Sequence, residues 1–181
     1  MAGVARTLLL VLLCMALPCT QVLAAPADEY AVKAAFIHNI AKFVEWPKQA
    51  AGGGKLRLCI LGKDPFGENI AVLRGKPVGR MEWEVLPVGL TADMKSCQAL
   101  FIAASAQDSL GQVRRRINGS PVLTLGDTRG FAEQGVMINF YLEDNKVRFE
   151  INREAAARAG LRIGSQLLRL GRIVTEQGGG K

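Results

Sequence analysis

The sequence predicts an α/β fold: a three-layer α/β/α sandwich with a mostly parallel sheet and a C-terminal antiparallel hairpin. Short apolar runs alternate with stretches of helical periodicity through most of the chain. Several of these runs are apolar at nearly every position, as in parallel strands that are buried on both faces. Nearer the C-terminus, two strand-like runs, 136–142 and 146–151, are separated by only three residues. Such a short link indicates a hairpin.

The first predicted element is an amphipathic helix over residues 28–46. Asp28 can cap the free N–H groups of its first turn, and Pro47 cannot continue it. Apolar side chains recur at helical spacing along one side, at Val32, Phe36, Ile40, Phe43 and Val44. Polar side chains off that stripe are Lys33, Asn39 and Lys42. We therefore expect the apolar side to lie on a core and the polar positions to face away from it.

Strand and helix signals then alternate along the chain. The predicted strands are 56–62, 81–88, 97–103 and 121–126, and the predicted helices among them are 64–73 and 107–117. Asp64 followed by Pro65 is a helix-start signal, because proline fits the first helical position. Two more helical stretches, 153–159 and 165–174, follow the hairpin. Alternation of this kind is typical of βαβ units, which build parallel sheets.

The first 24 residues have the pattern of a cleavable secretory signal peptide. Arg6 supplies the positive charge, an apolar run follows, and small or aliphatic residues precede a cleavage site after Ala24. A membrane anchor is the alternative, but a spanning helix needs roughly 20 apolar residues. A lipoprotein signal at Cys19 is disfavoured because Pro18 stands where such sites require a small residue. We expect residues 25–181 to form a single domain outside the cytoplasm that does not itself span the membrane.

The composition argues against nucleic-acid binding. After cleavage the chain keeps 22 basic and 16 acidic residues, a net charge of +6. Apart from the run 114–116 and the C-terminal arginines, the basic residues are scattered, whereas nucleic-acid binding favours a dense basic face with aromatic residues for stacking on bases. A solvated basic surface is one interpretation. An acidic partner, an anionic ligand or an anionic membrane surface is the other.

Two cysteines remain after cleavage, Cys59 and Cys97. In an oxidising compartment they favour a disulfide, and two buried free thiols are the alternative. A disulfide here closes a loop of nearly forty residues, worth roughly 4 kcal/mol on the chain-entropy account. We expect no metal site, because His38 is the only histidine and no CxxC pair occurs.

The sequence offers little for catalysis. His38 has no acidic residue nearby in sequence to orient it. The glycine loop 62–67 is followed by Glu68, where a phosphate-binding loop requires lysine. Asp64, Ser105 and Asp127 each follow a predicted strand, and open α/β sheets hold ligands at that edge. These three are candidates for a small-molecule site, with ordinary turn chemistry as the alternative, and we expect neither a cofactor nor an enzyme.

Nine short segments of the mature chain, taken in order, carry a family resemblance. They are 29–47, 58–67, 78–80, 97–102, 121–127, 130–132, 149–152, 159–161 and 165–168. The longest reads EYAVKAAFIHNIAKFVEWP. Together these segments resemble the YfiR family of periplasmic repressors of membrane diguanylate cyclases (YfiN-type). No single motif decides the resemblance, which rests on their order over nearly the whole mature chain.

The resemblance implies a periplasmic regulatory protein that binds the periplasmic sensor domain of an inner-membrane diguanylate cyclase. Repression of that cyclase lowers cyclic-di-GMP signalling and biofilm formation. The resemblance also implies an α/β domain, often a homodimer, with a disulfide between Cys59 and Cys97. Some members of the family carry a second cysteine pair, which this mature chain lacks.

Five residues are candidates for contact with the partner: Lys33, Asn39, Lys42, Trp46 and Arg80. Trp46 precedes Pro47 and a glycine-rich loop, where an aromatic ring can anchor an interface. A core position for Trp46 and ordinary solvation of the polar residues are the alternatives. A periplasmic small-molecule-binding sensor module is the alternative function, and an exported enzyme of unknown type is a third.

Overall fold

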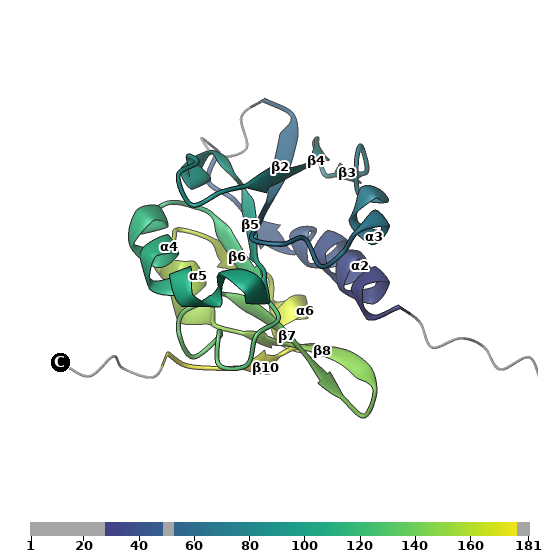
Figure 1. Ribbon diagram of the computed structural model, residues 1–181, viewed down its shortest axis with the longest axis vertical. Helices are drawn as coiled ribbons and strands as arrows, with labels where there is room; N and C mark the ends of the chain where they lie inside the picture. Colours follow the sequence, from purple (N-terminus) through teal and green to yellow (C-terminus); the bar gives the residue numbers. More distant parts are fainter. Residues whose placement is uncertain (1–27, 49–52, 177–181) are drawn as a thin grey trace, which may run out of the picture.

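The computed structural model describes residues 28–48 and 53–176, so the predicted signal peptide lies outside the described residues. A mixed sheet of eight strands forms its centre, in the order β10-β8-β7-β6-β5-β2-β4-β3 (Figure 1). The strands are β2 Lys55–Leu61, β3 Pro77–Val78, β4 Met81–Val88, β5 Ala99–Ile102, β6 Leu123–Gly126, β7 Ile138–Glu143, β8 Lys146–Ile151 and β10 Arg172–Ile173. The helices are α2 Glu29–Ala41, α3 Glu68–Ala71, α4 Leu110–Ile117, α5 Arg153–Arg158 and α6 Ser165–Leu168. The predicted α/β fold is confirmed.

The middle of the sheet is parallel, as the apolar runs predicted. Strands β4, β2, β5, β6 and β7 run parallel to one another, and every residue of β5 and β6 is buried. The predicted hairpin is β7 with β8, where Glu143 pairs with Lys146 and leaves a two-residue turn. Both turn residues, Asp144 and Asn145, have positive φ, at 49° and 58°. Asp and Asn tolerate this conformation, which a type I′ turn requires.

Helices cover the sheet on both sides. In Figure 1, α2 and α4 lie on opposite sides of the strands β5 and β6. On one side, α4 buries Leu110, Val113 and Ile117 in a smaller core. On the other side, α2 buries Ala34, Ile37 and Ile40 in a larger core that also receives small side chains of α5.

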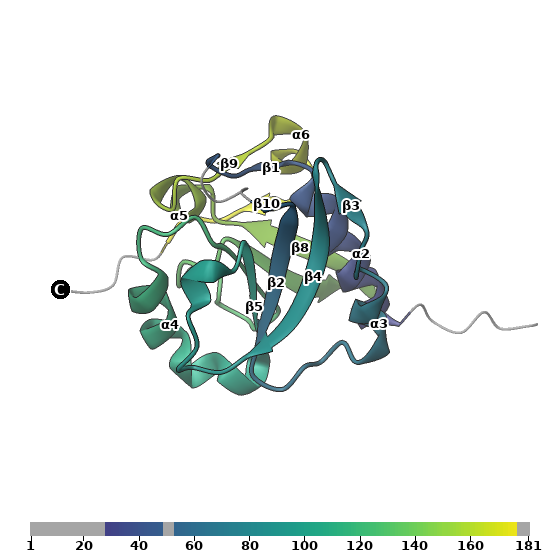
Figure 2. The same ribbon diagram turned by 90° about the horizontal axis from the view of Figure 1, so that it is seen from above.

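Helix α2 begins as predicted but ends earlier. The Asp28 carboxylate accepts a hydrogen bond from the Tyr30 N–H at 3.0 Å, which confirms the cap. The helix was expected to reach Trp46, and this is wrong, because it ends at Ala41. The next residues form β1 (Val44–Glu45), which pairs antiparallel with β9 (Arg162–Ile163), and Figure 2 shows this small sheet beside α6. A partner that lies far away in the sequence therefore overrides the local helical pattern.

The C-terminal segment also differs from the prediction. A helix was expected over 165–174, but α6 ends at Leu168 and Arg172–Ile173 extends the sheet beside β8. A Cβ atom on Gly171 would lie 2.6 Å from the Phe149 ring, so glycine lets the chain pass close to β8. Two other helices are shorter than expected: α3 covers only Glu68–Ala71, and a 3₁₀ segment precedes α4. Within the described ranges, no helix is long and apolar enough to cross a membrane.

Candidate functional site

An open groove of about 520 Å³ contains three of the five candidate contact residues. We call it the Trp46 groove, and its lining includes Lys42, Trp46, Lys48, Val78, Arg80 and Met81. Asn39 adjoins it, because the Lys42 Nζ donates to the Asn39 Oδ1 at 3.0 Å. Residues from the end of α2, from β1 and from the β3–β4 hairpin thus converge on one surface.

Local structure fixes these positions. The chain leaves α2 at Ala41 and enters β1, whose pairing with β9 sets the direction of the chain leading to Trp46. In the β3–β4 hairpin, Val78 pairs with Met81 and leaves a two-residue turn. Its first residue, Gly79, has φ 61°. Glycine with positive φ at this position is typical of a type II′ turn, which here projects Arg80 from the hairpin tip.

Trp46 combines a fixed position with partial exposure. Its indole N–H donates to the Gln98 carbonyl oxygen at 3.0 Å. The ring packs against the larger core and is half-buried, and the residue also lines the groove. A ring held in one orientation loses little side-chain entropy when a partner covers it, which is the property of an anchor residue.

The groove carries positive charge. Lys42, Lys48 and Arg80 are exposed, and no acidic side chain lines the groove. Over residues 28–48 and 53–176, none of the three forms an ion pair. Uncompensated surface charge of one sign attracts a partner of the opposite sign and speeds encounter.

Lys33 was expected to face away from the core, and this is wrong, because it is only 2% exposed. Its Nζ lies 2.5 Å from the Glu29 carboxylate and 2.7 Å from the Asp127 carboxylate. The Tyr30 hydroxyl also donates to Asp127, at 3.0 Å. Burial alone would lower the pKa of Lys33, but the hydrogen bonds to Asp127 and Glu29 outweigh it and raise that pKa. Lys33 therefore joins α2 to the loop after β6.

The three candidate ligand residues each have a local partner. The Asp64 carboxylate accepts from the Phe66 N–H at 2.8 Å, and the Ser105 hydroxyl accepts from the Lys63 N–H at 2.8 Å. Asp127 belongs to the Lys33 ion pair. Asp64 and Asp127 line separate hollows, so the structure does not gather the three into one pocket.

The hollow beside Asp127 contains polar residues that the sequence reasoning missed. We call it the Asn139 hollow; it measures about 520 Å³ and includes Lys33, Asp127, Glu133, Asn139, Glu150 and Arg172 in its lining. Asn139 and Glu150 face each other on β7 and β8, with 1% and 4% exposure. The sequence does indicate these residues, because each of the two apolar strands contains one polar residue and a buried polar side chain requires a partner.

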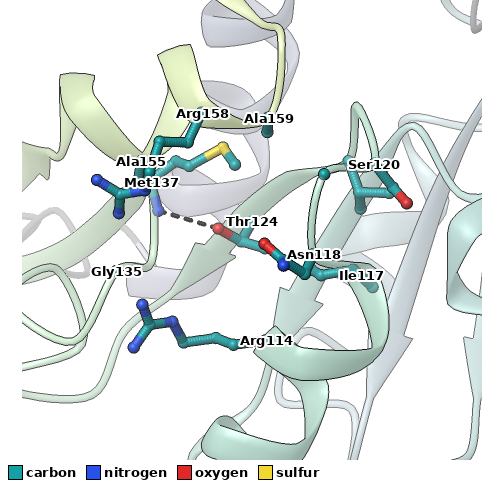
Figure 3. A pocket seen from close by; sticks show the side chains of 12 residues that line it. Arg114, Ile117, Asn118, Ser120, Thr124, Gly135, Met137, Ala155, Arg158 and Ala159 are labelled. Atoms are coloured by element: carbon teal, nitrogen blue, oxygen red, sulfur yellow. Dashed lines mark hydrogen bonds between the residues drawn. The ribbon is translucent and has the colours of Figure 1, made fainter.

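A smaller hollow of about 70 Å³ lies between α4 and α5. Figure 3 shows Arg114 and Arg158 lining it from different elements, with the Thr124 hydroxyl accepting from the Met137 N–H. Both arginines pair with the carboxylate of Glu176. Their charges are thus engaged in holding the C-terminal segment against α4 and α5.

The two buried cysteines form the expected disulfide, Cys59–Cys97, with Cα atoms 6.0 Å apart. It links β2 to Cys97, which directly follows the helical turn Met94–Ser96 and precedes the neighbouring strand β5. His38 also has a structural partner, because its Nδ1 accepts a hydrogen bond from the Trp83 indole N–H at 3.1 Å. Burial, followed by the nearby charges of Lys42 and Lys76, lowers the pKa of His38.

Comparison with known proteins identifies both family and fold. Residues 30–172 match the YfiR/HmsC-like family. A similar solved structure is the ABC domain in complex with L-Trp from Streptococcus pneumonia, with a TM-score of 0.54 and 10% sequence identity. The match covers 81% of this chain and 60% of that one, so this chain spans less than two thirds of that structure. At this identity the likeness shows the fold alone.

Proposed function

The chain belongs to the YfiR/HmsC-like family, and from this we propose that it is a periplasmic regulator of an inner-membrane diguanylate cyclase. It binds the periplasmic sensor domain of the cyclase and holds the enzyme inactive. Cyclic-di-GMP signalling and biofilm formation fall as a result. The observation that carries this proposal is the family match over residues 30–172.

The sequence and the disulfide together support the periplasm as the proposed compartment. Residues 1–24 have the pattern of a secretory signal, and we propose that residues 25–181 are the mature regulator. The Cys59–Cys97 disulfide is of a kind that persists in oxidising compartments such as the periplasm. From that side of the membrane, the protein can influence a cytoplasmic product only through a membrane-spanning partner.

The Trp46 groove is the proposed contact surface. A half-buried aromatic ring beside exposed cations suits a partner surface that has an apolar pocket rimmed by carboxylates. Trp46 contributes most of the affinity in this arrangement, whereas Arg80 and Lys42 contribute mainly to encounter rate and salt dependence. Lys33 is excluded as a contact residue in this arrangement, because its side chain is buried.

Repression requires unequal affinity for two states of the cyclase. A regulator shifts an equilibrium between active and inactive forms only by the difference between its affinities for them. A hundredfold preference for the inactive form corresponds to about 2.7 kcal/mol. Such a difference is within reach of one buried aromatic anchor, whose truncation typically costs 2 kcal/mol or more, about thirtyfold in affinity. A homodimer of the regulator would present two such grooves, and we include it in the proposal.

The test is calorimetric titration of the purified mature chain against the periplasmic domain of the cyclase. The wild type is expected to bind, and Arg80→Glu is expected to weaken binding at least tenfold, because it replaces an attractive charge in the groove with a repulsive one. Arg80 lies at a turn and is exposed, so this variant should keep its fold. The matched control is Arg115→Glu, which makes the same charge change on an exposed residue of α4.

The proposal is contradicted if the wild type does not bind the cyclase domain. If Arg80→Glu and Arg115→Glu reduce the affinity equally, the effect depends on net charge alone. The proposed function would then stand, but the contact surface would lie elsewhere. A cell-based cyclic-di-GMP measurement on the same variants connects binding with repression. The variant that binds weakly should release the cyclase and raise the cyclic-di-GMP level.

A further inference from the structure

The Trp46 groove has two walls that come from different parts of the chain. One wall is the end of α2 with β1, and the other is the β3–β4 hairpin, which contributes Val78, Arg80 and Met81. Behind these walls, the Trp83 indole N–H on β4 donates to the His38 Nδ1 on α2 at 3.1 Å (Figure 2). A histidine, whose charge changes near neutral pH, thus helps to hold the two walls together.

Trp83 is placed to pass a local change on to the hairpin. The residue is buried, with 2% exposure. Its backbone N–H donates to the Lys76 carbonyl oxygen at 3.0 Å, and its own carbonyl oxygen accepts from the Gly75 N–H at 2.9 Å. These two bonds hold the start of the hairpin whose turn carries Arg80. A shift of the Trp83 side chain therefore alters the position of one wall of the groove.

Proton uptake by His38 is incompatible with the bond to Trp83. An imidazole nitrogen that accepts a hydrogen bond carries no proton, so neutral His38 holds its proton on Nε2. Protonation adds the second proton at Nδ1, on the lone pair that the Trp83 N–H uses. Two N–H donors then face each other, and a buried donor that loses its acceptor costs about 1–3 kcal/mol. The contact must open before the proton can bind.

The charges around His38 also oppose the imidazolium. Burial, followed by the charges of Lys42 on α2 and Lys76 in the segment before β3, lowers the pKa of His38. Within residues 28–48 and 53–176, neither lysine forms an ion pair that would cancel its charge. A proton on His38 adds a third positive charge between α2 and the hairpin, and the repulsion favours separation of the two walls.

We propose that His38 is a proton-sensitive switch of the Trp46 groove: proton uptake at Nδ1 releases Trp83, the two walls lose their fixed spacing, and the affinity for the cyclase domain falls. This inference rests on the proposed function, because it concerns the regulation of the same groove. His38 acts through Trp83 and the hairpin, as a positioning residue. Because proton uptake and partner binding are linked, a bound partner in turn makes His38 harder to protonate. Acidification therefore releases the cyclase and raises the cyclic-di-GMP level.

The first test uses the mature chain without the cyclase. The chain contains two tryptophans, so ¹⁵N NMR shows two indole N–H signals, which Trp46→Phe assigns. Between pH 7.5 and 5.0 the Trp83 signal is expected to move with one inflection, below about pH 6.5. The Trp46 indole donates to a backbone carbonyl, which does not titrate, so its signal is the internal control. A Trp83 signal that does not follow the ionisation of His38 overturns the inference.

The second test is calorimetric titration of the mature chain against the cyclase domain at pH 7.5 and 5.0, with circular dichroism to verify that both proteins are folded. The wild type is expected to bind about threefold or more weakly at pH 5.0, and by no more than about tenfold per pH unit, because one proton is involved. His38→Gln removes the titrating group and keeps an oxygen that can accept from Trp83. Its affinity is expected to change much less between the two pH values.

The outcomes separate this inference from the proposed function. Groups that titrate on the partner affect the wild type and His38→Gln alike, so only the difference between the two proteins reports on His38. Binding at pH 7.5 with the same pH dependence in both proteins overturns the inference and leaves the proposed function intact. Absence of binding by the wild type at pH 7.5 overturns the proposed function, and with it the regulation that rests on it.

Discussion

Loss of the Cys59–Cys97 disulfide is expected to destabilise the domain strongly. Both cysteines are almost fully buried, at 1% and 2% exposure, so reductant reaches them only after unfolding. Reduced protein is therefore prepared by unfolding and refolding in dithiothreitol. This procedure removes the covalent link without changing any residue.

The size of the effect follows from the length of the closed loop. The two cysteines are separated by 38 positions. On the chain-entropy relation, a loop of this length removes about 13 cal/mol/K from the unfolded chain, or about 4 kcal/mol at 25 °C. With a urea dependence of about 2 kcal/mol/M, the unfolding midpoint is expected to fall by about 2 M.

Urea unfolding followed by circular dichroism measures this difference. The Cys59→Ala/Cys97→Ala double variant is the control, because dithiothreitol should not move its midpoint. Coincident transitions for the oxidised and reduced wild type would refute the reasoning. They would show that the link restrains the unfolded chain far less than its length predicts.

Three further predictions concern the buried groups and the glycines. Lys33→Met leaves Asp127 buried without its cation and is expected to lower the free energy of unfolding by about 3–5 kcal/mol. Adding Asp127→Asn should recover part of that loss. A loss below about 1 kcal/mol in urea unfolding would contradict the buried ion pair. Burial and two nearby lysines lower the pKa of His38 in the folded state, so the unfolded chain binds more protons. The resulting contribution to the free energy of unfolding is fully present above about pH 6.5 and is lost as the pH falls towards the folded-state pKa. Free energies of unfolding measured across this pH range should show this slope in the wild type and lose it in His38→Gln. In Gly126→Ala the new Cβ would lie 2.6 Å from a phenylalanine ring, which should destabilise the protein by about 1–3 kcal/mol. In Gly111→Ala, on α4, nothing lies nearer than 3.5 Å to the new Cβ, so the protein should become more stable by about 0.5–1 kcal/mol. Stability changes of the same sign for both variants in thermal unfolding would contradict the packing.

The sequence predicted those elements whose signal is local. The strands expected over 81–88 and 146–151 coincide with β4 and β8, because strand period and turn residues are properties of adjacent positions. The two-residue strand β3, which pairs with the adjacent β4, was not predicted, and neither were the two-residue strands β1, β9 and β10. Strands β1, β9 and β10 exist because a segment distant in the sequence lies beside each of them, and neither periodicity nor capping residues record such a partner.

The candidate sites show the same limit. Trp46 was chosen at the expected end of a helix, Lys42 as a polar residue off its apolar stripe and Arg80 between two expected strands, and the structure brings the three together in one groove. Lys33 was misplaced because helical periodicity identifies one packed face, and the approach of Asp127 from the loop after β6 was not visible. The buried position of Asn139 could have been predicted from the sequence, because Asn139 is a polar residue between two apolar ones in a strand.

The affinity of the mature chain for the periplasmic domain of its cyclase tests the central claim most directly. The account predicts measurable binding by the wild type, at least tenfold weaker binding by Arg80→Glu, and unchanged binding by Arg115→Glu. Absence of binding by the folded, oxidised wild type would contradict it.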